Sequence, residues 1–247
     1  RDPQSPDALL ALGRMLTRSG DPQGGLKYLN TAYNLAVQNS NDRNKAAAQY
    51  GMGVAYDFLN KLDEALRSLR DSLTLRRKFG DERGGAASLN YIGVVQGEQG
   101  NSKAADKSFQ EALNIQNKIG DKRGLGATLL DYGSFLDDHG NHEQALKLYQ
   151  QSLQIQRDLN NNSMQARVLN NIGSVDYNIG RYEDALIYFQ RALELREKAK
   201  VPGDIVEVLN NLGETSKSMG QYDQAISQYM RALDLRRNMG DKRGAAI

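Results

Sequence analysis

The chain has no cysteine and no tryptophan, and only four of its 247 residues are proline. The lack of cysteine excludes a disulfide framework, a thiolate nucleophile and a cysteine metal site. No apolar run approaches the roughly 20 residues that a membrane-spanning helix needs, and no leader resembles a signal peptide. We therefore expect a cytoplasmic protein without a membrane partner.

Charge of one sign is also lacking, because 32 basic and 30 acidic residues leave a net charge of +2. This balance does not favour a polyanionic partner. The only histidines, His139 and His142, flank a glycine-asparagine turn, a place and spacing that suit no usual zinc pair. A phosphate-binding glycine loop is absent, and serines without a histidine base give no nucleophile. We therefore expect no catalytic residue, no metal, no cofactor and no enzyme activity.

What the chain has instead is a repeat of 40 residues. One glycine recurs with this period in six positions, and a column of large residues follows it by sixteen. The glycines are Gly13, Gly53, Gly93, Gly133, Gly173 and Gly213, and the large residues are Leu29, Leu69, Phe109, Tyr149, Phe189 and Tyr229. A fixed period of this length is typical of an array of one structural unit.

Each unit is predicted to contain two helices. A glycine or asparagine cap closes each helix, as at Gly100 and Asn160. The second helix has acidic residues in its first turn and basic residues in its last turn, which is the order that the helix dipole favours. A glycine inside a helix costs about 1 kcal/mol relative to alanine. Six glycines at one phase therefore need a packing reason, and we expect each to let the second helix cross close to the first.

Stacked pairs of this kind bury a continuous core that one pair cannot bury alone. The predicted fold class is therefore all-α, an α-solenoid of six helix-turn-helix units wound as a right-handed superhelix. We expect one single array over residues 1–247, and the first helices of the units are predicted to line its concave face. The expected repeats span approximately residues 1–40, 41–80, 81–120, 121–160, 161–200 and 201–240.

The motif between Leu209 and Leu233, large residues and glycine in the first helix and large-x-x-Ala-Leu in the second, resembles the tetratricopeptide repeat (TPR). Units of 40 residues with Gly-Asp-x-x-Gly junctions, as at 80–84, are similar to repeats of the Pins/LGN-type adaptors. Helices containing Leu-Asn-Asn-Leu are similar to those of kinesin light chains. The resemblance implies a scaffold, adaptor or signalling module that binds a peptide or protein segment in the concave groove.

The last residues, 240–247, copy the opening of an earlier unit at 80–87. We therefore expect residues 241–247 to begin a truncated seventh repeat of a longer protein.

The resemblance places ligand contacts on the first-helix face that the core does not use. Asparagines there could pair with the main chain of an extended peptide through both amide groups. We expect Asn170 and Asn210 to do so, and Tyr50, Val54, Val94 and Tyr177 to supply pockets; the alternative is that the asparagines bridge neighbouring helices inside the array. The other groove residues predicted are Asp57, Asn90, Leu130, Ser134, Asp137, Asn171, Ser174, Asn211 and Glu214.

Acids in the middle of this face favour a ligand with basic and apolar residues, or are merely a solvated surface, while Arg14 and Arg18 lie at one end. Nucleic-acid binding is a less favoured alternative, through the basic junctions Lys78, Arg83, Lys118, Lys122, Arg123, Arg236, Arg237, Lys242 and Arg243. A third alternative is structural: self-association through open array ends, or masking of a fused domain.

Overall fold

The structure, a computed structural model, describes residues 5–200 and 202–240. Twelve α-helices and no strand are found in these residues, which confirms the all-α prediction. The first helices of the six pairs are called A helices here. They are α1 Pro6–Arg18, α3 Asp42–Phe58, α5 Glu82–Glu98, α7 Lys122–Asp138, α9 Asn162–Asn178 and α11 Pro202–Ser218. The second helices are called B helices. They are α2 Pro22–Gln38, α4 Leu62–Lys78, α6 Ser102–Ile119, α8 His142–Asp158, α10 Tyr182–Ala199 and α12 Tyr222–Asn238. The predicted start of a seventh repeat lies outside the described residues.

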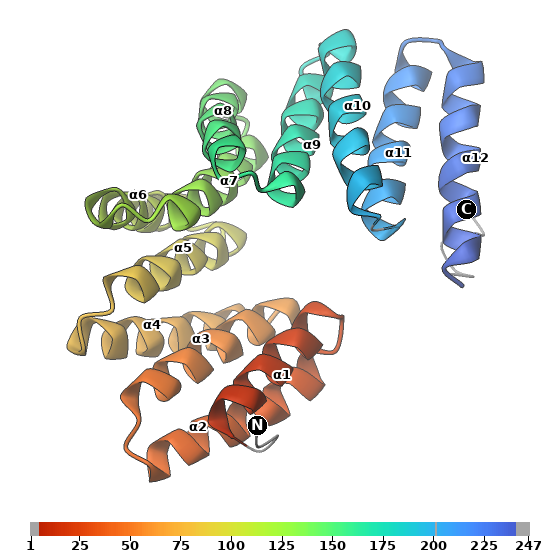
Figure 1. Cartoon of the computed structure of the whole chain (residues 1–247). Helices are drawn as coiled ribbons and strands as arrows, with labels where there is room; N and C mark the ends of the chain where they lie inside the picture. Colours follow the sequence, from red (N-terminus) through yellow and green to blue (C-terminus); the bar gives the residue numbers. More distant parts are fainter. Residues whose placement is uncertain (1–4, 201, 241–247) are drawn as a thin grey trace. The chain divides into compact units, whose positions relative to one another are not determined.

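The chain forms two compact units, residues 1–132 and 133–247, whose boundary falls inside α7. In the N-terminal unit each A helix packs on its own B helix, and α2 and α4 pack on the A helices that follow them (Figure 1). The C-terminal unit repeats this order from α8 to α12, where each helix packs on the next. Each unit is thus a stack of helix pairs, as in a helical repeat solenoid.

Every twentieth residue, from Gly20 to Gly240, has a positive φ. Eight of these twelve positions are glycine, which adopts the left-handed conformation without steric cost. The remaining four are Ser40, Asn60, Asn160 and Lys200. These residues end the helices, so the predicted glycine and asparagine caps are confirmed.

The periodic glycine marks the point where the two helices of a pair come closest. A Cβ added at Gly173 would lie 2.8 Å from the ring of Phe189, and one added at Gly53 would lie 2.6 Å from Leu69 Cγ. Gly13, Gly93, Gly133 and Gly213 meet the large residue sixteen positions later in the same way. The packing reason predicted for the glycines is therefore confirmed, because a methyl group has no room at these positions.

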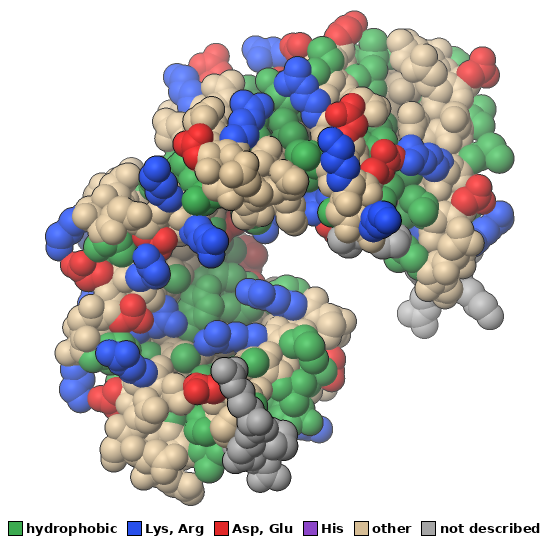
Figure 2. Space-filling view, in the orientation of Figure 1, with side chains coloured by type: hydrophobic (Ala, Val, Ile, Leu, Met, Phe, Trp, Pro, Cys, Tyr) green, Lys and Arg blue, Asp and Glu red, His purple; other side chains and the backbone are tan. Residues whose placement is uncertain are grey.

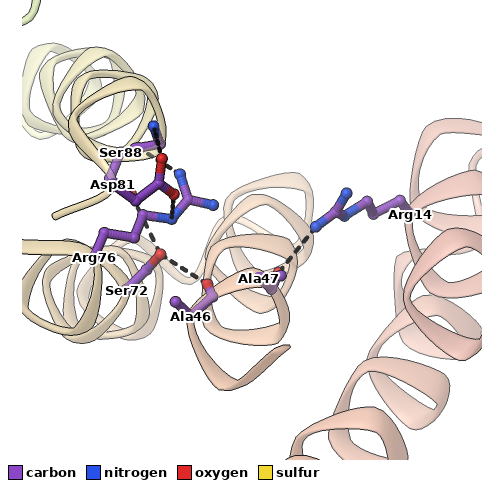
Figure 3. A network of polar contacts seen from close by, with 8 residues as sticks. Arg14, Ala46, Ala47, Ser72, Arg76, Asp81 and Ser88 are labelled. Carbon is purple, nitrogen blue, oxygen red and sulfur yellow. Dashed lines mark hydrogen bonds and ion pairs between the residues drawn. The ribbon is translucent and has the colours of Figure 1, made fainter. Parts of the chain in front are cut away.

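Polar side chains join the helices of one pair to each other and to the next pair (Figure 3). Ser72 Oγ in α4 donates to the carbonyl oxygen of Ala46 in α3 at 2.8 Å, and Ser88 Oγ in α5 donates to Ser72 Oγ at 3.3 Å. The Arg76 guanidinium, near the end of α4, donates to the carbonyl of Gly84 in α5 and lies 4.0 Å from Asp81. In the C-terminal unit the equivalent arginine, Arg196, pairs with the carboxylate of Asp204 in α11.

Among the described helices, none combines the length and the apolar character needed to cross a membrane.

The glycine contact can be tested with Gly173→Ala. The new methyl group would meet the nearly fully buried ring of Phe189, so we expect the free energy of unfolding to fall by ~1–3 kcal/mol. Gly85→Ala is the matched control, because a Cβ there would lie 3.7 Å from Leu73 Cδ1, an ordinary contact. Helix propensity should make this control neutral or stabilising by up to about 1 kcal/mol. Denaturant unfolding that ranked the two variants in the opposite order would contradict this account.

Candidate functional site

The A helices of the N-terminal unit carry a string of aromatic and charged side chains. The rings of Tyr50 in α3 and Tyr91 in α5 meet edge to face, with centroids 6.0 Å apart. The guanidinium of Arg76 lies over the Tyr50 ring, 5.1 Å from its centroid, and the Tyr91 hydroxyl donates to Asp57 Oδ2 at 2.7 Å. Tyr50, Tyr91 and Asp57 are only half-buried, as are Val54 and Val94 beside them. This string therefore offers rings, aliphatic groups and a carboxylate to a ligand.

A second carboxyl group, Glu98 at the end of α5, lies close to Asp57. Partial burial and the neighbouring Asp57 carboxyl raise the pKa of Glu98 to about 8. Burial and the charge of Asp57 also raise the pKa of Tyr91, which therefore stays a neutral donor. Asp57, Tyr91 and Glu98, called the acid cluster here, form the acidic end of the string.

The column predicted to carry the groove is largely buried. Asn90 is 9% exposed, Asn170 is 7% exposed and Leu130 is fully buried, so the prediction that these three side chains face a ligand is corrected. Asn90 Nδ2 instead donates to Asp131 Oδ2 in α7 at 2.8 Å. These positions point toward a neighbouring A helix and not toward the open face of the array.

Asn170 bridges two helices of the C-terminal unit, which is the alternative that the sequence left open. Its Nδ2 donates to Glu207 Oε1 in α11 at 3.1 Å, and its Oδ1 accepts from Asn211 Nδ2 at 2.9 Å. Asn171, one residue on, reaches back to α7 and donates to Ser134 Oγ at 3.2 Å. Ser134 also accepts from the Tyr149 hydroxyl at 3.1 Å. The amides of Asn170, Asn171 and Asn211 therefore join successive A helices.

The half-buried column begins one residue later than predicted. After the first turn of α5, the accessible side chains are half-buried Ala87, Tyr91 and Val94 and exposed Glu98, spaced at i, i+4, i+7 and i+11. Adjacent residues on a helix diverge by about 100°, so a shift by one position separates the contact between A helices from the open face. For this reason the sequence analysis did not predict Tyr91 as a groove residue. The only signal for it in the sequence is that a large aromatic residue stands next to the predicted Asn90.

The remaining predicted residues of the C-terminal unit lie nearer its surface. Tyr177 packs on Tyr182, with ring centroids 5.5 Å apart, and its hydroxyl lies 3.1 Å from Ser218 Oγ. Asp137 lies 2.6 Å from His142 Nδ1. Half-buried Ser174 donates to the carbonyl oxygen of Asn170 at 3.1 Å.

A pocket of about 590 Å³ opens between α11 and α12. Burial and exposed Glu214 raise the pKa of Tyr229, whose ring lines this pocket. Its lining residues are Asn210, Glu214, Tyr229, Met230, Ala232, Leu233 and Arg236. Of the predicted residues, Asn210 and Glu214 therefore face an open space.

Several cations of the basic junctions pair with acids, and Figure 2 shows Lys and Arg interspersed with Asp and Glu on the visible face. Lys78 lies 3.2 Å from Asp42 and Lys118 lies 2.8 Å from Glu82. Arg83 likewise pairs with Asp121 at 3.4 Å. Two further residues of the predicted basic edge, Lys242 and Arg243, lie outside the described residues. This arrangement gives little support to a nucleic-acid surface.

These helix pairs and their junctions define a helical repeat protein of the kind that binds other proteins or peptides. The family model of the tetratricopeptide repeat matches residues 4–78, 84–158 and 164–238. The chain therefore belongs to the tetratricopeptide repeat family. No curated protein matches the sequence significantly.

Solved structures with the same fold include BtubC (BKLC) from P. vanneervenii, at 17% identity and a TM-score of 0.74 over 95% of this chain and 92% of that one. A Rap protein complexed with competence and sporulation factor is 21% identical, with a TM-score of 0.72 over 95% and 67% of the two chains. NprR in complex with its cognate peptide NprX is 16% identical, with a TM-score of 0.65 over 94% and 67%. The chain thus spans about two thirds of the Rap and NprR structures. At these identities the likeness shows the fold alone.

The raised pKa of Glu98 predicts a pH-dependent stability. Between the usual value of 4.5 and the folded-state value of about 8, the folded protein holds a proton at Glu98 that the unfolded chain has released. The free energy of unfolding should therefore fall as pH rises through this window. The effect should be small, because the Glu98 side chain is exposed and solvent screens it.

Denaturant unfolding at pH 5 and pH 8 checks this prediction. Glu98→Gln keeps a hydrogen-bond donor that cannot ionise, so this variant should lose less stability over the same interval. If the stability of Glu98→Gln fell more between pH 5 and pH 8 than that of the unsubstituted protein, the raised pKa of Glu98 would be contradicted.

The bridging role of Asn170 predicts that Asn170→Ala destabilises the C-terminal unit. The substitution removes both hydrogen bonds of a buried amide, so we expect the free energy of unfolding to fall by ~1–3 kcal/mol. Asn210→Ala is the matched control, because Asn210 is half-buried beside the pocket and should change stability by less than about 0.5 kcal/mol. Equal unfolding curves for Asn170→Ala and the unsubstituted protein would rule out the bridge.

Proposed function

We propose that this chain is a non-catalytic module that binds a peptide or protein segment on the open faces of its A helices. It would act as an adaptor or as a regulatory domain. The observation that carries the proposal is the string formed by Tyr50, Tyr91 and Asp57, with Val54 and Val94 beside it. Partly exposed rings next to aliphatic groups supply contact area, and nearby carboxylates supply specificity.

The fold supports this proposal, because chains of the same fold have been solved with partners. NprR was solved with its cognate peptide and a Rap protein with competence and sporulation factor. TPR arrays bury their cores between stacked pairs and leave one side of each A helix for recognition. Here that side includes the half-buried columns of α3 and α5.

The ligand would be an extended segment that carries both apolar and basic residues. The acid cluster suits a lysine or arginine side chain, because Asp57 is a carboxylate and Glu98 can ionise beside a cation. Val54 and Val94 suit an apolar side chain. In the C-terminal unit, Tyr177, Asn210 and Glu214 are the predicted residues best placed to touch a ligand, since the amide of Asn170 is occupied.

Selection from a displayed library of random nonapeptides tests the proposed function. The 247-residue chain should enrich a set of peptides with apolar and basic residues. Val94→Glu should reduce their binding at least tenfold, because it replaces an apolar contact with a charged side chain that must lose water when an apolar residue of the peptide packs on it. Asn114→Glu adds the same charge at an exposed position of α6 and should leave binding unchanged.

Circular dichroism would confirm that both variants keep their helical content, and Val94→Thr replaces Val94→Glu if the latter does not fold. The proposal is wrong if no peptide is enriched. It is also wrong if the enriched peptides bind a folded groove variant as well as they bind the control.

A further inference from the structure

The open face of α3 ends in an exposed aromatic ring. Phe58 is 56% exposed, and it stands forty residues before Glu98, so it belongs to the same accessible column of the repeat. Every member of this column is exposed, and the other members are hydrophilic: Arg18, Glu98, Asp138, Asn178 and Ser218. α3 therefore presents an apolar ring to solvent where the other A helices present polar or charged groups.

Phe58 adjoins the acid cluster through its own helix. It directly follows Asp57, and Val54 precedes it by one turn, so Val54 and Phe58 are neighbours on the surface of α3. The Tyr91 hydroxyl joins Asp57 to α5 at 2.7 Å, and Glu98 lies close to Asp57. An exposed ring, an aliphatic group and two carboxyl groups are therefore gathered around Asp57.

The two carboxyl groups lack a cation within residues 5–200 and 202–240. Neither Asp57 nor Glu98 forms an ion pair there, whereas Asp42 and Asp121 at the junctions do. Asp57 Oδ2 accepts from Tyr91, but Asp57 Oδ1 is buried and has no hydrogen-bond partner in the same residues. Two carboxyl groups that lie close together and partly removed from water gain stability from an added cation.

Arginine suits this combination of groups better than lysine. A guanidinium is planar and has five N–H donors, so it can donate to two carboxyl groups while its flat face lies on a ring. A lysine ammonium is a compact and strongly hydrated charge. The N-terminal unit uses arginine in this way twice, because Arg76 lies over the Tyr50 ring and Arg43 lies over the Phe79 ring, 5.1 Å and 5.9 Å from the ring centroids.

We propose that Phe58, Asp57 and Glu98 form a subsite for an arginine side chain of the bound peptide. The guanidinium donates to the carboxyl groups, and its flat face lies on the Phe58 ring. Val54 and Val94 then remain for the apolar residue next to the arginine. This inference rests on the proposed function and deepens it, because it names the basic residue that the site selects.

Three pools of octapeptides test the subsite. The peptides are N-acetylated and C-amidated, and they share the same randomised neutral residues around one central residue. That residue is arginine in the first pool, lysine in the second and citrulline, a neutral analogue of arginine, in the third. Each pool is passed over the immobilised 247-residue chain, and the retained peptides are quantified by mass spectrometry.

We expect the arginine pool to be retained about threefold better than the lysine pool, which is the gain of an exposed cation–π contact, and the citrulline pool to be retained least. Phe58→Leu keeps an apolar side chain without a ring, so it should remove the preference for arginine over lysine and keep the preference for both over citrulline. Phe58→Trp, which keeps an aromatic face, should retain the preference for arginine. Glu98→Gln should bring both charged pools closer to the citrulline pool.

Tyr222→Leu is the matched control, because it removes a ring that is 65% exposed on α12. It should leave all three retentions unchanged. Circular dichroism confirms that each variant keeps its helical content.

The subsite is wrong if arginine and lysine peptides are retained equally, if the citrulline pool is retained as well as the arginine pool, or if Phe58→Leu keeps the preference for arginine. In each case, loss of the retained peptides with Val94→Glu would leave the proposed function standing. Retention of no pool at all would contradict both the subsite and the proposed function.

Discussion

The rest of the structure depends on the close approach of a backbone glycine in each A helix to a large side chain in its B helix. At Gly173 and Phe189 the ring fills the volume that a methyl group would occupy. This contact sets the distance between the two helices of a pair, and Ala192, three residues after Phe189 in α10, is fully buried. Six contacts of the same kind give six pairs of similar geometry, and only pairs of similar geometry can stack.

Stacking in turn divides each A helix into three sides. One side packs on its own B helix, and another faces neighbouring A helices through polar bridges such as Asn170 to Glu207 and Asn90 to Asp131. Only the remaining side is open, and it carries Tyr91, Val94 and Glu98 on α5. Both polar atoms of the buried Asn170 amide are paired, since an unpaired one would lose its hydrogen bonds to water. Ligand recognition is therefore left to the half-buried columns.

Charge follows the same division. Across the junctions, several cations are matched with acids, as Lys118 is with Glu82 and Arg83 with Asp121. On the open side of the N-terminal unit, the Arg76 guanidinium covers the Tyr50 ring and the Tyr91 hydroxyl donates to Asp57, so a cation and a carboxylate both lie close to the two rings.

The sequence by itself determined the repeat of 40 residues, the helix pairs, their caps and the reason for Gly13 and its five equivalents. All of these depend on local conformation or on contacts within one 40-residue repeat, and such contacts recur with the period. Only the tertiary structure decided which columns are open. Asn90 and Tyr91 both belong to columns with the period of 40 residues. The rotation of about 100° between adjacent helix positions nevertheless points Asn90 toward a neighbouring A helix and Tyr91 toward the open face. The pairing of Asn170 with Glu207 and that of Arg14 with the Ala47 carbonyl were likewise decided by helices more than 30 residues away, which no local pattern encodes.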